Sequence, residues 1–259
     1  MDYYDIQDIL YYCTQEQMRN FTLIAKVINQ MVKTNYELLT VLHFDVDYST
    51  CYYAAMFGYV YCLKYAHENG CGWDKNTCIF AASHGHLDCL KYAHENGCKW
   101  DECTCIRAVE YGNLDCLKYA HENRCPWNRE TCWRAAYFGH LDCLKYAHEN
   151  GCPWNRETCW RAVYGGHLDC LKYSHENGCP WDKGICECAV EYGRLDCLKY
   201  AHKNGCTWDE DTVYASINNG HFACLTYALN NGCSCDKIAC KNLMKERRKE
   251  KRKAKKLFV

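Results

Sequence analysis

The sequence predicts an all-α solenoid built from seven repeats of 27 residues. Three observations predict it. One nine-residue string recurs at a constant spacing, helix-capping residues recur at fixed places, and apolar residues within each copy follow the helical period. The string CLKYAHENG and its close variants begin at Cys62, Cys89, Cys116, Cys143, Cys170, Cys197 and Cys224. The copies therefore fill residues 47–235, and a partial eighth copy begins at Asp236.

The fourth copy, residues 128–154, illustrates the expected unit. Asn128 is a favourable N-cap for a first helix, and Gly139 should end that helix in the left-handed conformation. The apolar face of the first helix carries Cys132, Ala135 and Ala136. A second helix, from about Leu141 to Asn150, places on one side Leu141, Leu144, Ala147 and His148. Each helix is too short to be stable alone, so neighbouring pairs should stack into a continuous core.

The repeat resembles the ankyrin repeat. The run Ala135-Ala136-x-x-Gly139-His140-Leu141-Asp142, followed by Leu144-Lys145 and Gly151, has the spacing of that family. The unit is shorter than the usual 33 residues, and the missing residues fall where ankyrin proteins carry a β-hairpin finger. The resemblance therefore implies helices without fingers. The Cys- and Tyr-rich 27-residue unit also resembles ankyrin-like proteins that large DNA viruses of amoebae encode.

The two ends differ from the repeats. Residues 1–46 predict an N-terminal helical cap that is faintly similar to an F-box, with Ile9-Leu10, Met18 and Leu23-Ile24-Ala25-Lys26 at the places of that motif. The alternative is a simple capping bundle. Residues 236–244 predict a C-terminal cap on the last repeat, and residues 245–259 form a basic tail.

Charge and composition narrow the function classes. Lys245 to Lys256 holds nine Lys/Arg and two Glu, so this segment carries +7 and the remainder −8. An acidic body does not suggest a nucleic-acid-binding domain, although the tail could contact RNA or direct nuclear import. No apolar run reaches the ~18 residues of a membrane-spanning helix, and the acidic N-terminus is not a secretory signal. We therefore expect a cytoplasmic protein, with the nucleus as an alternative.

The 25 cysteines are periodic. They form three columns, represented in the fourth repeat by Cys132, Cys143 and Cys152. Cysteine packs as a small apolar residue, and helices about 8–10 Å apart hold equivalent thiols beyond disulfide range. Core packing of reduced thiols is thus the first interpretation. Because His-x-x-x-Cys recurs six times, a zinc-binding or redox-responsive protein is an alternative. We expect no metal, cofactor or small-molecule substrate, and in-register copies argue against a catalytic Cys–His pair.

Comparison among the copies indicates where a partner would bind. The second helix hardly varies, whereas the first helix and the following turn differ strongly between copies. Packed positions do not tolerate such differences in volume, so the variable residues should lie on an exposed face. Tyr, Trp and Arg dominate binding hot spots. The candidate partner-binding residues are therefore Trp133, Arg134, Tyr137, Phe138, Trp160, Arg161, Tyr164, Arg107 and Tyr111. The tryptophans that recur in register, from Trp73 to Trp208, should instead pack between repeats.

The sequence thus predicts a non-enzymatic scaffold that binds another protein through the first-helix face. It contains no phosphate-binding loop, nucleophile elbow or isolated pair of acids. The main alternative is an F-box-like substrate adaptor of a ubiquitin ligase, in which residues 1–46 would dock ligase components.

Overall fold

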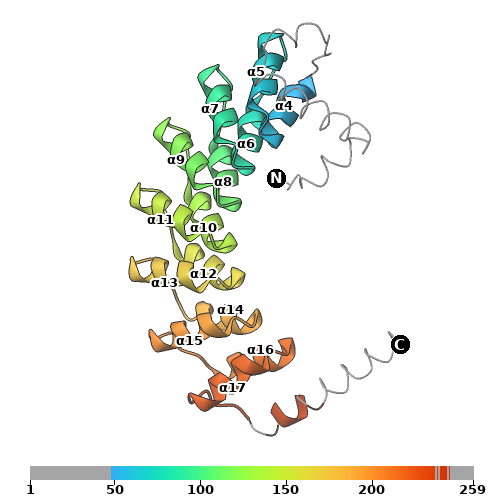
Figure 1. Cartoon of the computed structure of the whole chain (residues 1–259). Coiled ribbons are helices and arrows are strands. Elements are labelled where there is room, and N and C mark those ends of the chain that lie inside the picture. The colour runs from blue at the N-terminus through green and yellow to red at the C-terminus, as the bar shows by residue number, and fades with distance from the viewer. Residues whose placement is uncertain (1–47, 237, 239, 244, 246–259) are drawn as a thin grey trace, which may run out of the picture. The chain divides into compact units, whose positions relative to one another are not determined.

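The computed structural model describes residues 48–236, 238, 240–243 and 245, and these residues form paired helices without any β-strand among them (Figure 1). The first helices of the repeats are α4 (Tyr48–Phe57), α6 (Lys75–Ser83), α8 (Glu102–Glu110), α10 (Arg129–Phe138), α12 (Arg156–Gly165), α14 (Gly184–Glu191) and α16 (Glu210–Asn219). The second helices are α5 (Val60–Glu68), α7 (Leu87–Glu95), α9 (Leu114–Glu122), α11 (Leu141–Glu149), α13 (Leu168–Glu176), α15 (Leu195–Lys203) and α17 (Phe222–Asn230). The predicted all-α array of helix–turn–helix units is therefore confirmed, fingers being absent from the described range. The F-box-like segment and nearly all of the basic tail lie outside the described residues.

Local capping explains where each first helix begins and ends. The side chain of Asn128 accepts a hydrogen bond from the backbone N–H of Glu130 at 2.8 Å, which satisfies one of the open donors of α10. Asp74, Asn155 and Asp209 cap their helices in the same way. At the other end Gly139 is left-handed, with φ of 80°. The N-cap and C-cap predicted for the fourth repeat are therefore confirmed.

Gly139 is also a point of close approach, and this gives a testable prediction. A Cβ atom at this position would lie 2.3 Å from Nδ1 of His167, whereas a Cβ at Gly151, with φ of 82°, would have no heavy atom within 4 Å. Gly151→Ala should therefore cost about 1–2 kcal/mol through the left-handed backbone alone. Gly139→Ala should cost more, because the imidazole must also move. Urea denaturation of both variants measures the difference, and equal losses would contradict the close approach.

The described residues divide into two compact units. The first comprises residues 48–108 and 115–126, and the second comprises 109–114 and the described residues from 127 onward. Within the first unit, α4 packs on α6 and α5 packs on α7. Within the second, α10 packs on α12, α12 on α14 and α14 on α16, while α11, α13, α15 and α17 form the parallel series of second helices. First helices thus contact first helices, and the variable positions of adjacent repeats become neighbours.

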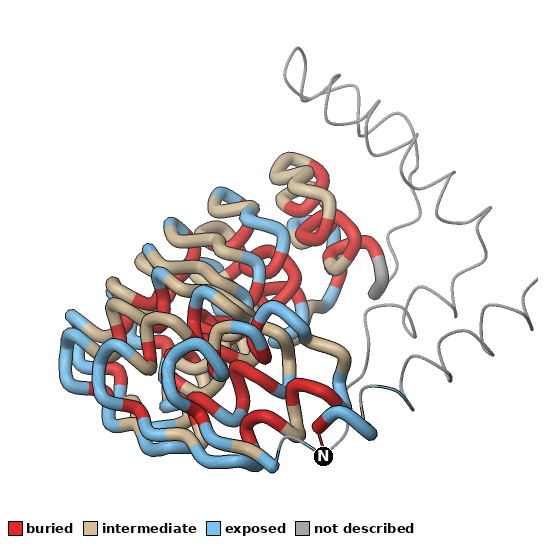
Figure 2. Tube along the Cα trace, turned by 90° about the horizontal axis from the view of Figure 1, so that it is seen from below, coloured by how far each residue is buried: buried red, intermediate tan, exposed pale blue. Residues whose placement is uncertain are grey.

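The core consists of leucine, alanine and cysteine. Six leucines of the second helices are 0% exposed, namely Leu63, Leu90, Leu117, Leu144, Leu171 and Leu198. Figure 2 shows buried segments recurring along the helices and exposed segments at the turns. The three cysteine columns are buried as well, which confirms their predicted packing role, and no described cysteine is disulfide-bonded. Burial raises the pKa of the Cys170 thiol to about 12, so this thiol stays protonated at neutral pH.

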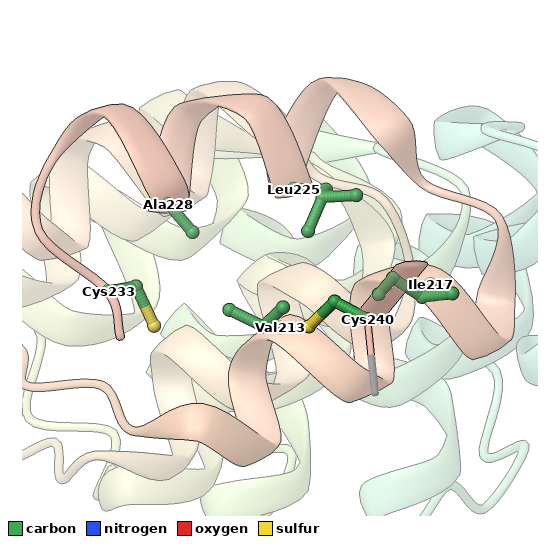
Figure 3. Packing of buried hydrophobic residues seen from close by; sticks show 6 residues of the cluster. All are labelled: Val213, Ile217, Leu225, Ala228, Cys233 and Cys240. Carbon is green, nitrogen blue, oxygen red and sulfur yellow. The ribbon is translucent and has the colours of Figure 1, made fainter. Parts of the chain in front are cut away.

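The last repeat is covered by the start of the partial eighth copy. Asp236 accepts a hydrogen bond from the backbone N–H of Ile238 at 2.8 Å, as the N-caps of the full repeats do. Cys240, which is 5% exposed, then packs against Val213, Ile217 and Leu225 (Figure 3). The apolar surface that another full repeat would cover is thereby partly removed from water.

A stacked aromatic triad joins successive second helices. In the second unit the ring of His148 lies on Trp154 with centroids 3.6 Å apart, and its Nδ1 is 3.0 Å from the hydroxyl of Tyr173 in the next repeat. Trp154 meets Tyr173 edge-on at 6.2 Å. The same triad recurs as His67–Trp73–Tyr92, His94–Trp100–Tyr119, His175–Trp181–Tyr200 and His202–Trp208–Tyr227. These contacts confirm that the tryptophans in register pack between repeats.

Candidate functional site

The candidate site lies on α10 and α12 of the second unit, which begin with the same six residues. Arg129 to Arg134 and Arg156 to Arg161 both read RETCWR. In each helix the threonine and cysteine are buried, and the following tryptophan and arginine are half-buried. Because α10 packs directly on α12, the two Trp-Arg pairs come together across the repeat boundary. We call this surface the tryptophan–arginine face, formed by Trp133, Arg134, Tyr137, Phe138, Trp160, Arg161 and Tyr164.

Guanidinium groups and indole rings alternate along this face. The guanidinium carbon of Arg134 lies 4.9 Å from the ring centroid of Trp133, and that of Arg161 lies 4.7 Å from the same ring. Arg161 also lies 5.2 Å from the ring of Trp160. The indole of Trp133 therefore contacts two cations, an arrangement in which each contact contributes about 0.5–1 kcal/mol at an exposed site. These contacts hold the side chains in fixed positions before any partner arrives.

Phenol and phenyl rings extend the face toward the ends of the helices. Tyr164 lies 5.5 Å from Tyr137 and 5.3 Å from Trp160, measured between ring centroids. Tyr137 contacts Phe138 edge-on at 4.7 Å, and Tyr164 reaches Tyr192 after α14 at 4.2 Å. Phe138 is 40% exposed, although it is large and apolar. The face therefore presents a connected aromatic surface that crosses three successive repeats.

The two arginines of the face are held very differently. Arg134 forms ion pairs with Glu110 and Glu130, and the side chains of Arg134 and Glu110 are only 12% and 4% exposed. Arg161 pairs with Glu157 at 3.2 Å, where both side chains remain about one-third exposed. The difference arises because the residue equivalent to Glu110 in the next repeat is Tyr137. Arg134 is therefore mainly a structural ion-pair partner, whereas Arg161 is the more available cation.

Two grooves lie beside the tryptophans, and they occupy equivalent places in successive repeats. The first has a volume of about 610 Å³ and is lined by Asn128, Arg129, Glu130, Trp133, Pro153 and Glu157. The second has a volume of about 500 Å³ and is lined by Asn155, Arg156, Glu157, Trp160, Trp181, Asp182, Gly184 and Ile185. Four positions of the first groove recur 27 residues later in the second. Each groove thus offers one indole wall, one arginine and at least one carboxylate.

The expectation that the whole variable column is exposed is wrong for several copies. Ile79, Phe80, Ile106 and Cys188 are 8%, 6%, 7% and 2% exposed, because large apolar side chains at these positions fold into local clusters. Phe80, for example, packs with Tyr53 and Met56. Exposure at one position therefore changes with the neighbouring side chains.

Two of the predicted partner-binding residues lie apart from the cluster of contacts described above. Arg107 is half-buried on α8 of the first unit, so nothing joins it to the tryptophan–arginine face of the second unit. Tyr111 follows α8 and is 49% exposed. The other seven residues form the connected set. Sequence reasoning did not single out Glu110 or Tyr192, and both are variable-column residues whose spacing to Arg134 and Tyr164 is close to one repeat.

The His-x-x-x-Cys pattern does not gather metal ligands in the described residues. Among these residues no three His, Cys, Asp or Glu side chains converge. The reason is visible in the fourth repeat, where the imidazole of His148 stacks on Trp154 and its Nδ1 approaches a tyrosine hydroxyl. The histidine side chain is therefore used in the repeat interface.

Comparisons with known proteins support the repeat assignment. The family model for ankyrin repeats, many copies, matches residues 51–94 and 78–121. The ankyrin repeat domain of human ASB11 is similar in fold, with a TM-score of 0.54, 18% identity, and coverage of 61% of this chain and 84% of that chain. No curated protein sequence matches the chain. Among the described residues, no helix is long and apolar enough to cross a bilayer.

Proposed function

We propose that this chain, which carries ankyrin repeats over residues 51–121 and an ankyrin-like fold through its described repeats, is a non-enzymatic scaffold for another protein. Ankyrin repeats typically bind proteins, and the candidate surface here is the tryptophan–arginine face. The observation that carries the proposal is the alternation of Arg134, Trp133, Arg161 and Trp160 on adjacent helices. Residues of these types supply most of the energy at protein interfaces, where few side chains dominate.

The grooves indicate what kind of segment would bind. They recur at equivalent places and each has an indole on one side, so two successive anchor side chains of one partner could occupy them. Arg156 at the rim is 77% exposed, and Glu157 borders both grooves. An extended partner segment with two apolar anchors and mixed charges fits this arrangement, since buried apolar contacts supply affinity and rim charges supply orientation.

The test is a paired alanine substitution. Trp133→Ala with Trp160→Ala should weaken partner binding by about 2 kcal/mol or more, because both groove walls and the cation–π contacts are lost. Folding should change little, since the same column carries the exposed Glu187 in the sixth repeat. Partners captured from the native cell, followed by calorimetry with the captured protein, measure the affinity. Phe222→Ala removes another ring that is 40% exposed and serves as the matched control.

The result also separates the alternatives. If the paired variant binds as tightly as the unchanged protein, the tryptophan–arginine face is not the interface. The prediction of a ligase adaptor depends on residues 1–46, so capture with and without that segment tests it separately. Ligase components that appear only when residues 1–46 are present would favour the adaptor.

A further inference from the structure

Two cysteines from different columns meet within each repeat. In the fifth repeat Cys159 lies on α12, and Cys179 follows α13 after the chain has returned to the start of α12. The Cys159 sulfur is 3.8 Å from the carbonyl oxygen of Cys179, and the Cys179 thiol donates to the carbonyl of Asn155 at 3.1 Å. The thiol of Cys159 also hydrogen-bonds the sulfur of Cys179. The helical hairpin therefore brings together two thiols that are 20 residues apart.

The same pairing recurs along the chain. Thiol–thiol or thiol–carbonyl contacts join the pairs Cys51 and Cys71, Cys78 and Cys98, Cys132 and Cys152, Cys159 and Cys179, and Cys186 and Cys206. These pairs differ from the equivalent cysteines of neighbouring repeats, which the spacing of packed helices keeps apart. The hairpin closure, and not the stacking of repeats, produces the proximity.

The two thiols of a pair have distinct environments. Cys179 is 3% exposed and lies between the exposed residues Gly178 and Pro180, whereas Cys159 is 0% exposed on its helix. The hydrogen bond from Cys159 lowers the pKa of Cys179, and the same bond together with burial raises the pKa of Cys159. The thiolate is the reactive form of cysteine, so Cys179 is the sulfur that a small reagent meets first.

We propose that each of these intra-repeat pairs is an oxidation site at which a hydroperoxide converts two thiols into one disulfide. The Cys179 thiolate attacks a peroxide oxygen, the O–O bond breaks, and the leaving hydroxide takes a proton to become water. The sulfur of Cys159 then attacks the resulting sulfenic acid. An S–S bond forms, the S–O bond breaks, and a second water leaves, so the two electrons lost by the thiols reduce one peroxide. The product ties the first helix of the repeat to the linker after its second helix.

The test is a peptide map of the folded full-length protein after treatment with hydrogen peroxide and alkylation of the remaining thiols. Trypsin places Cys179 in the peptide Tyr173–Lys183 and Cys159 in Glu157–Arg161. We expect these two peptides to appear joined, with a mass lower by two hydrogens than their sum, and to separate on reduction. A product in which Cys179 carries only sulfinic acid, or a link formed only after denaturation, would overturn the proposal.

Variants assign the link. Glu157–Arg161 has the same sequence as Glu130–Arg134, so Cys132→Ala and Cys159→Ala must be compared. The link to Tyr173–Lys183 should persist in Cys132→Ala and be lost in Cys159→Ala. Cys170→Ala is the matched control in the same repeat, because Cys170 is also buried, at 1% exposed, and should not be needed. Circular dichroism confirms that each variant is folded, and loss of the link in Cys170→Ala alone would contradict the assigned pairing.

Discussion

Replacing Leu144 by alanine should lower the free energy of unfolding by about 2–5 kcal/mol. Leu144 is 0% exposed on α11 and occupies the leucine column of the core. Truncation removes buried apolar surface and leaves a cavity that the surrounding short helices can fill only in part. Urea denaturation followed by far-ultraviolet circular dichroism measures the loss.

The matched control for this substitution is Leu229→Ala. Leu229 lies on α17 and is 40% exposed, so the same chemical change should stay within about 0.5 kcal/mol of the unchanged protein. Similar losses at the two positions would mean that the leucine column does not form the core described here.

The second large effect is expected at Arg134. Arg134→Ala should destabilise the protein by about 3 kcal/mol, because it removes the cation that faces the nearly buried carboxylate of Glu110. The penalty of a desolvated charge exceeds that of losing an ordinary surface contact. Equilibrium unfolding at neutral pH provides the measurement.

Arg161→Ala is the equivalent change one repeat later. Its partner Glu157 is 36% exposed, so the pair should contribute at most about 1 kcal/mol. The contrast between the two arginines is the diagnostic quantity, since both belong to the same six-residue sequence. If the two variants unfold at the same urea concentration, the buried ion pair has no special weight.

Much of the fold follows from the sequence because the repeat spacing repeats every local signal. Asn128 and Gly139 each predict one helix boundary through well-understood backbone chemistry, and the structure places both boundaries there. The burial of cysteine columns follows from their periodicity in the same way. The recurring tryptophans could be assigned to the interface because identical residues in every copy serve the contact that every copy makes.

The candidate site was less predictable because it depends on contacts between positions that vary. Arg134 looks equivalent to Arg161 in the sequence, yet only Arg134 meets a glutamate on the preceding helix. The burial of Phe80 likewise depends on the aromatic and methionine side chains of the first repeat. The pairing of Cys159 with Cys179 was missed because the spacing argument compared only cysteines of the same column.

The His–Trp–Tyr triad gives the chain a standard joint, and this has an evolutionary consequence. Deleting residues 155–181 would bring Trp154 and His148 to Tyr200, which replaces Tyr173 with the same residue type in the same register. Recombination that adds or removes whole 27-residue units should therefore be tolerated at this joint. Such events would shift the order of the first-helix residues and so change the binding surface while leaving the connections between second helices intact.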